Sequence, residues 1–136
     1  MSKNGDSAGR MGGGRSSSHA ERLSAEEKAR ALRARRALAL FMEQMPGAVV
    51  TDVALLLSIA SEHIGQGEHA ERLGLDRSGA SVAVRRLGQG GRGAYRKGMD
   101  WVAYEPDPND DRRKIPVLTA SGEMMVRTLL DALAPN

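Results

Sequence analysis

Residues 67–88, GEHAERLGLDRSGASVAVRRLG, constrain the fold of this chain more than any other segment. The first part predicts a short helix over residues 68–73, and the second part predicts a helix that begins at residues 76–78 and runs to about residue 87. Gly74 lies between them, where a glycine supplies the left-handed backbone that a sharp reversal needs. The inward face is expected to consist of small and aliphatic residues: Ala70, Leu73, Leu75, Ala80, Val84 and Leu87.

Two short helices joined in this way resemble the helix-turn-helix pattern, whose second helix enters the major groove of DNA. Small residues open the second helix, so its N-terminus can approach a groove closely and its amides can face phosphate. The outward face is predicted to contact DNA through Arg77, Ser78, Ser81, Val82, Arg85 and Arg86. The alternative interpretation is an ordinary helical hairpin whose arginines are solvated.

Charge is segregated along the chain, although the net charge is only +3. Residues 1–36 carry nine Lys or Arg against four Asp or Glu, and residues 72–100 carry seven against two. Residues 37–71 between them carry no Lys or Arg and five acids. This segregation favours a polyanion-facing surface opposite a buried or partner-facing one. Because aromatic residues make up only 3% of the chain, the expected ligand is a duplex and not a stacked single strand.

The chain has 136 residues, which predicts one domain over residues 20–136. Residues 1–19 are rich in Gly and Ser and are expected to form a disordered tail. The tail is either merely solvated or a basic arm that touches phosphates. With no cysteine and no apolar stretch of membrane-spanning length, the sequence indicates a cytoplasmic protein, at the nucleoid when bound to DNA.

Three further helices are predicted around this motif. The first begins at Ser24, whose spacing to Glu27 matches a capping box, and ends near Met45. The second is capped by Thr51 or Asp52, continues to about residue 64 and is apolar nearly all round, which is typical of a buried central helix. The last covers residues 121–133, with Thr119 or Ser121 as its cap.

The segment after the two motif helices predicts a β-hairpin. Residues 101–105 read as an edge strand and residues 114–118 as its antiparallel partner, with Pro116 on a free edge because it has no N–H to donate. A two-stranded hairpin directly after a helix-turn-helix is a wing. The fold class is therefore mainly α with a small β-wing, a winged helix-turn-helix.

The sequence between the predicted strands, DPNDDRRK, combines acids and bases in a turn. Arg112, Arg113 and Lys114 are predicted to reach a phosphate or the minor groove from the wing. Asp110 is predicted to support the wing, because it can pair with Arg112 or bond turn amides and so hold the arginine in one rotamer.

These residues also carry a family resemblance. The run Asp107-Pro-Asn-Asp-Asp-Arg112, followed by Leu118-Thr-Ala-Ser-Gly122, resembles the wing and following helix cap of MarR-type winged-helix transcriptional regulators, whose pattern is D-x-R followed by L-T-x-x-G. With the preceding helix pair, the match covers about residues 50–125. Residues 88–100 depart from the pattern, because they add a basic glycine-rich loop where the family usually turns directly into the first strand.

The resemblance implies a homodimer on pseudo-palindromic double-stranded DNA, with recognition helices in successive major grooves. It also implies that the N- and C-terminal helices build the dimer. The predicted dimer residues are apolar positions on those helices: Leu38, Phe41, Met42, Met45, Leu129, Leu130 and Leu133.

No pattern of catalytic residues, cofactor motif or metal site is predicted. GQGGRG at residues 88–93 follows a helix instead of a strand, so it does not predict a dinucleotide site. His19, His63 and His69 lack ligand spacing and are expected to be solvated or at helix ends.

The sequence thus predicts a sequence-specific DNA-binding regulator, a dimeric repressor and not an enzyme. Base readout is assigned to Arg77, Ser78, Ser81 and Arg85, and phosphate binding mainly to Arg86, Arg112, Arg113 and Lys114. Two alternatives stay open: a plasmid or phage architectural, partition or replication accessory protein, and a winged-helix protein-interaction module. The sequence identifies no small-molecule or protein effector.

Overall fold

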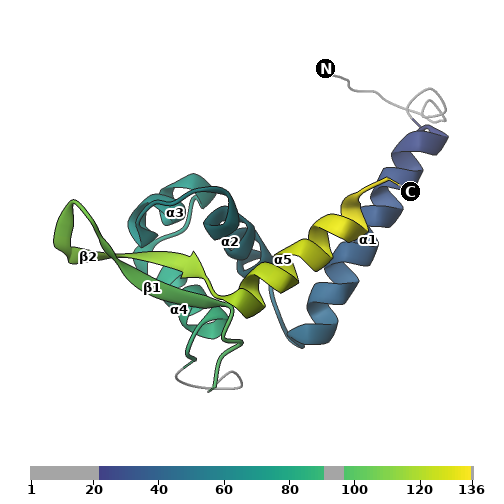
Figure 1. The fold of residues 1–136 in the computed structure, drawn as a ribbon. Helices are drawn as coiled ribbons and strands as arrows, with labels where there is room; N and C mark the ends of the chain where they lie inside the picture. The colour runs from purple at the N-terminus through teal and green to yellow at the C-terminus, as the bar shows by residue number, and fades with distance from the viewer. Residues whose placement is uncertain (1–21, 91–96, 136) are drawn as a thin grey trace. The chain divides into compact units, whose positions relative to one another are not determined.

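The computed structural model describes residues 22–90 and 97–135. The described residues form five helices and one two-stranded antiparallel sheet (Figure 1). The predicted tail at residues 1–19 lies outside them, as do residues 91–96 of the predicted loop. The chain divides into two compact units, one ending at Leu32 and the other beginning at Arg33.

Helix α1, Ala25–Gln44, begins in the first unit. The amide of Glu27 donates to Ser24 Oγ at 3.1 Å, and the amide of Ser24 donates to Glu27 Oε1 at 2.8 Å. The predicted capping box is confirmed, and its hydrogen bonds from Ser24 lower the pKa of the Glu27 carboxyl. All the described side chains of this first unit, residues 22–32, are exposed.

The second unit has one apolar core around helix α2, Val50–Ser61. Helix α2 contributes four buried apolar residues, which confirms the predicted central helix: Val53, Leu55, Leu56 and Ile59. The end of α1 adds Phe41 and Met45, and the Phe41 ring lies 5.6 Å from that of Trp101 between centroids.

Two predicted boundaries of α2 were wrong. Its N-cap is Val49, and Asp52 lies in the first turn and accepts the Val49 amide at 2.9 Å. A carboxylate at the third helical position can bond the cap amide, so the acid marks the helix start without being its cap. The helix also ends at Ser61, before the residue 64 expected from the apolar pattern, because Gly65 serves as the N-cap of the next helix.

Helices α3, Gln66–Leu73, and α4, Arg77–Leu87, form the predicted helix-turn-helix. Gly74 between them has φ +67°, the left-handed conformation that its position called for. Asp76 caps α4, accepting the Gly79 amide at 2.6 Å. The inward side of α4 is buried through Ala80, Ala83, Val84 and Leu87.

Strands β1, Val102–Asp107, and β2, Asp110–Leu118, form the predicted hairpin, which is hereafter called the wing. Val102 pairs with Leu118 and Glu105 with Ile115, which confirms the predicted antiparallel pairing of the two segments. The strands extend further towards the turn than predicted, because the ladder continues into exposed, charged sequence. Only Pro108 and Asn109 remain for the turn. In Figure 1 the two strands pass beside α3 and α4 as a twisted ribbon.

Helix α5, Ala120–Leu133, follows the wing. Thr119 caps it, since Thr119 Oγ1 accepts the Gly122 amide at 3.0 Å. A Cβ at Gly122 would collide with the carbonyl oxygen of Trp101, so the close approach of α5 to this segment requires glycine. The Leu-Thr-x-x-Gly motif therefore has a local packing reason.

The base of the basic loop is closed by three backbone hydrogen bonds. The amides of Met99, Asp100 and Trp101 donate to the carbonyls of residues 86, 88 and 87 at 3.0, 2.9 and 2.8 Å. The chain thus returns to the end of α4 before it enters β1. Within residues 22–90 and 97–135, no helix has the length and apolar character needed to cross a bilayer.

Candidate nucleic-acid interface

The outward face of α4 carries the residues predicted to read bases. Arg77, Ser78 and Arg85 are exposed, Val82 is 40% exposed, and Ser81 is half-buried. Ser78 Oγ donates to Asp76 Oδ1 at 3.3 Å, so the cap residue also orients the first serine of the helix. The helix presents short side chains at its start and arginine at both ends of this face.

A hollow of about 470 Å³ lies along the N-terminal half of α4. Its lining comes from α3, from α4 and from the wing: Gln66, Gly67, Ala70, Arg77, Ala80, Ser81 and Arg113. The recognition helix and the wing therefore border a common depression, which contains two arginines.

A second hollow of about 400 Å³ lies at the C-terminal end of α4. Arg85 from α4 and Lys114 from β2 line it, together with Gly88 and Tyr104. Burial raises the pKa of the Tyr104 phenol, and the charge of Arg85 opposes that rise. Each of the two hollows thus combines a cation of α4 with a cation of the wing.

The wing tip presents Arg112, whose side chain is 95% exposed. Asp110 Oδ1 accepts the backbone amide of Arg112 at 3.0 Å and lies 3.9 Å from Arg112 Nε. Asp107 Oδ1 similarly accepts the Asn109 amide at 2.9 Å. The acids of this segment thus bond turn amides, and Arg112 extends from a hydrogen-bonded turn.

Arg113 has a different environment from its neighbour. Its Nη2 lies 2.9 Å from Glu68 Oε1 on α3, and its Nε lies 3.9 Å from Asp107 Oδ2. Glu68 also accepts the Gly65 amide at 3.0 Å, and this bond, with Arg113, lowers the pKa of the Glu68 carboxyl. Arg113 therefore ties the wing to the start of α3 instead of extending freely.

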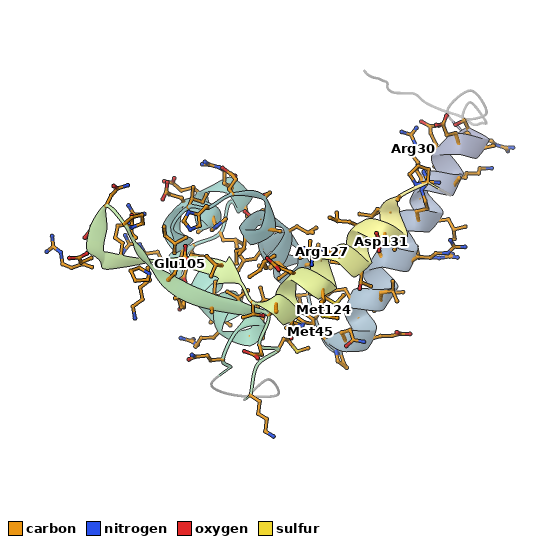
Figure 2. The ribbon with its side chains drawn as sticks, viewed as in Figure 1. Arg30, Met45, Glu105, Met124, Arg127 and Asp131 are labelled. Atoms are coloured by element: carbon orange, nitrogen blue, oxygen red, sulfur yellow. The ribbon has the colours of Figure 1, made fainter. Side chains whose placement is uncertain are left out.

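Two more contacts join the wing to the α3 region. His63 Nε2 lies 2.6 Å from Glu105 Oε1 on β1, the acid labelled in Figure 2. The Tyr104 hydroxyl donates to Gln66 Oε1. None of these links was predicted, because their partners are about 40 residues apart and no local pattern signals them.

Arg86 is also paired within the chain. Its Nη2 lies 2.5 Å from Oδ1 of Asp52 at the start of α2, and the Asp52 side chain is only 1% exposed. Arg86 was predicted to hold phosphate from the outward face, but its guanidinium is directed towards α2. No local pattern signals this pair, since the two residues are 34 positions apart.

The residues predicted to build a dimer do not share one surface. Phe41, Met45 and Leu129 are buried within the chain's own core. Leu38, Met42, Leu130 and Leu133 are exposed, and Met42 is 61% exposed. The helices are apolar on more than one side, so spacing alone could not separate core positions from surface positions. Leu38 and Met42 also border a small apolar hollow of about 180 Å³, which is lined by Val49 and Val50 as well.

His69 does not match its predicted solvated setting. Its side chain is fully buried, and Nδ1 lies 2.7 Å from Ser58 Oγ, while Nε2 has no hydrogen-bond partner among the described residues. Burial lowers the pKa of the imidazole. Among residues 22–90 and 97–135, no three His, Asp or Glu side chains are grouped as metal ligands would be.

The helix pair and the ribbon that follows it define a winged helix-turn-helix protein. Transcriptional regulator Tm0710 from Thermotoga maritima is similar, with a TM-score of 0.59 and 22% identity over 78% of this chain and 66% of that one. This chain thus spans slightly less than two thirds of the length of Tm0710. MarR is similar with a TM-score of 0.53 and 21% identity over 80% of this chain and 75% of its own.

A structure of overoxidized AbfR bound to DNA also matches, with a TM-score of 0.51 and 20% identity over 78% of this chain and 68% of that one. No protein-family model and no curated protein sequence matches the chain. The chain has the fold of the MarR-type winged-helix transcriptional regulators, which confirms the predicted resemblance and the fold class.

Proposed function

We propose that this chain is a sequence-specific, double-stranded DNA-binding transcriptional regulator that acts as a dimeric repressor. The observation that carries the proposal is the surface around α4. Two hollows beside α4 are lined by Arg77 with Arg113 and by Arg85 with Lys114, so each hollow combines a cation of the helix with a cation of the wing. AbfR, which shares this fold, is bound to DNA in its structure. We assign the chain a binding role and no catalysis.

In the proposed complex, α4 enters the major groove. The small residues at its start allow the close approach, and Arg77 and Arg85 are the side chains long enough for bidentate contact with guanine. Arg112 at the wing tip reaches the adjacent minor groove or backbone, and Lys114 holds a phosphate. Arg113, which is paired with Glu68, positions the wing.

The dimer is proposed from exposed apolar surface. Residues 22–32 bury no side chain within the chain, and an isolated helix of this kind is only marginally stable in water. Leu38, Met42, Leu130 and Leu133 are exposed as well. For binding to successive major grooves, the proposed dimer requires its two recognition helices to lie about 34–36 Å apart. The corresponding operator is pseudo-palindromic.

The proposed setting is the cytoplasm, at the nucleoid when DNA is bound. The accessory-protein alternative predicts extended coverage of DNA, whereas the regulator predicts a discrete protected site. The interaction-module alternative predicts no measurable duplex binding even at low salt. No feature of the described surface favours either alternative.

The test is selection of bound duplexes from a random library, followed by footprinting of the selected sequence. The proposal expects a palindromic consensus and one short protected site, with solution mass of the free protein equal to that of a dimer. Selection that yields no consensus, together with protection that spreads along the DNA, would contradict the regulator and support the accessory protein.

A further inference from the structure

The buried pair of Asp52 and Arg86 links the recognition helix to the core helix α2. Asp52 Oδ1 receives Arg86 Nη2 at 2.5 Å, and Asp52 Oδ2 receives the Val49 amide at 2.9 Å. Both oxygens of one carboxylate are therefore occupied, one by α4 and one by the first turn of α2.

The side chain of Arg86 is half-buried, and its guanidinium is bonded within the chain. Its side chain is 28% exposed, and its Nε is buried with no hydrogen-bond partner among the described residues. The preceding residue, Arg85, is exposed and lines the hollow shared with the wing. Adjacent helical residues differ by about 100° in direction, so one arginine can face the DNA side while the next faces α2.

A buried carboxylate is costly without its partner, so the pair restricts how α4 can sit on α2. If α4 rotated or slid, either Arg86 would separate from Asp52 or the first turn of α2 would have to move as well. The backbone carbonyl of Arg86 is fixed too, because it accepts the Met99 amide at 3.0 Å. Base contacts need side chains held within about half an ångström, a precision that a helix free to rotate does not give.

We infer that Asp52 and Arg86 are positioning residues for sequence readout, acting through the placement of α4 and not through contact with DNA. The inference rests on the proposed DNA-binding function. It removes Arg86 from the phosphate contacts and adds Asp52, an acid, to the residues on which specific binding depends. Simple electrostatics makes the opposite prediction for Asp52, since loss of an acid favours binding to a polyanion.

The test compares Asp52→Asn, Arg86→Met and, as a control on the wing, Lys114→Met. Each variant is titrated with a duplex selected from a random library and with a scrambled duplex of the same composition, over a range of salt concentrations. The two readouts are the ratio of the two affinities and the slope of log association constant against log salt. Circular dichroism and binding to the scrambled duplex show that each variant is folded.

The inference expects Asp52→Asn and Arg86→Met to lower the affinity ratio about tenfold, roughly one base contact, while the salt slope stays at the wild-type value. Lys114→Met should instead weaken both duplexes alike and reduce the slope by about 1.8, which is about 0.9 for each protomer of the proposed dimer. If Asp52→Asn does not fold, the double variant with Arg86→Met leaves no buried charge unpaired and carries the same expectation.

Two results would overturn the inference while leaving the proposed function intact. If Arg86→Met reduces the salt slope as much as Lys114→Met does, Arg86 is a phosphate contact. If Asp52→Asn leaves the affinity ratio unchanged, Asp52 has no positioning role. Failure of the proposed function itself gives a different result. Wild-type protein would then bind neither duplex at low salt, and the inference would fall with it.

Discussion

Replacement of Arg85 by alanine separates base readout from stability. Arg85 is exposed and makes no ion pair within the part of the chain that the structure describes, so truncation leaves no buried partner. We expect the free energy of unfolding to change by less than about 0.5 kcal/mol. On DNA, the loss is one bidentate contact with guanine, about 1–3 kcal/mol or roughly 5- to 150-fold in affinity.

A dimer on a palindromic site loses this contact twice, so the total loss is about 2–6 kcal/mol if the two half-sites are independent. Fluorescence anisotropy with the selected duplex and with one substituted at the contacted guanine measures the effect. Arg85→Ala should bind both duplexes with nearly the same affinity, whereas the wild type should prefer the first.

The matched control is Arg127→Ala, which removes an exposed arginine from α5 (Figure 2). It has the same change of charge and should retain the wild-type preference. If Arg85→Ala also keeps the full preference for the selected duplex, α4 does not read bases through this residue and the assignment is refuted.

Three further predictions concern the wing, the core and the dimer. Arg112→Ala should weaken binding to all duplexes alike and lower the slope of log affinity against log salt by about 1.8, which is about 0.9 for each protomer of the dimer. An unchanged slope would place the wing tip away from the backbone. Burial lowers the pKa of His69 from its ordinary 6.5, so the folded state favours neutral imidazole, and the free energy of unfolding should decrease as pH falls below about 6.5. Urea titrations at pH 7.5 and 5.5 measure this decrease, and an equal decrease in His69→Gln would show that another group causes it. Met42→Glu should give a monomer in sedimentation equilibrium, because it places a charge on the exposed apolar surface of α1. The control Ala60→Glu, at an exposed position of α2, should stay dimeric. A dimeric Met42→Glu would exclude the surface around Met42 from the interface.

Features that depend on neighbouring residues were predictable from the sequence. Ser24, Asp76 and Thr119 cap helices because each side chain accepts an amide three residues further along the chain. The left-handed conformation of Gly74 depends on its own backbone angles. The apolar character of α2 likewise predicted its burial. These signals sufficed for the element order and the winged helix-turn-helix.

Contacts between distant residues were not predictable in this way. Whether Arg86 faces DNA or Asp52 depends on where α2 lies relative to α4, and composition treats Arg85 and Arg86 alike. The same holds for Arg113, which the sequence grouped with Arg112 but the fold pairs with Glu68. Charge patterning thus groups these cations together, whereas the fold pairs Arg86 and Arg113 with acids of the same chain.

Apolar spacing had a related limit on α1. It identified the apolar positions of the helix, but burial against α2 and Trp101 took Phe41 and Met45 into the core. Leu38 and Met42 remained exposed on the same helix. A period of 3.6 residues shows that a face is apolar and does not show which neighbour covers it.

The central claim is that the exposed face of α4 and the wing together bind duplex DNA. An amide chemical-shift titration of the isotopically labelled protein with the selected duplex tests it most directly. We expect the largest shifts on residues 77–85 and 110–114, with small shifts along α5. Large shifts confined to α5 or the end of α1, with residues 77–85 unmoved, would contradict it.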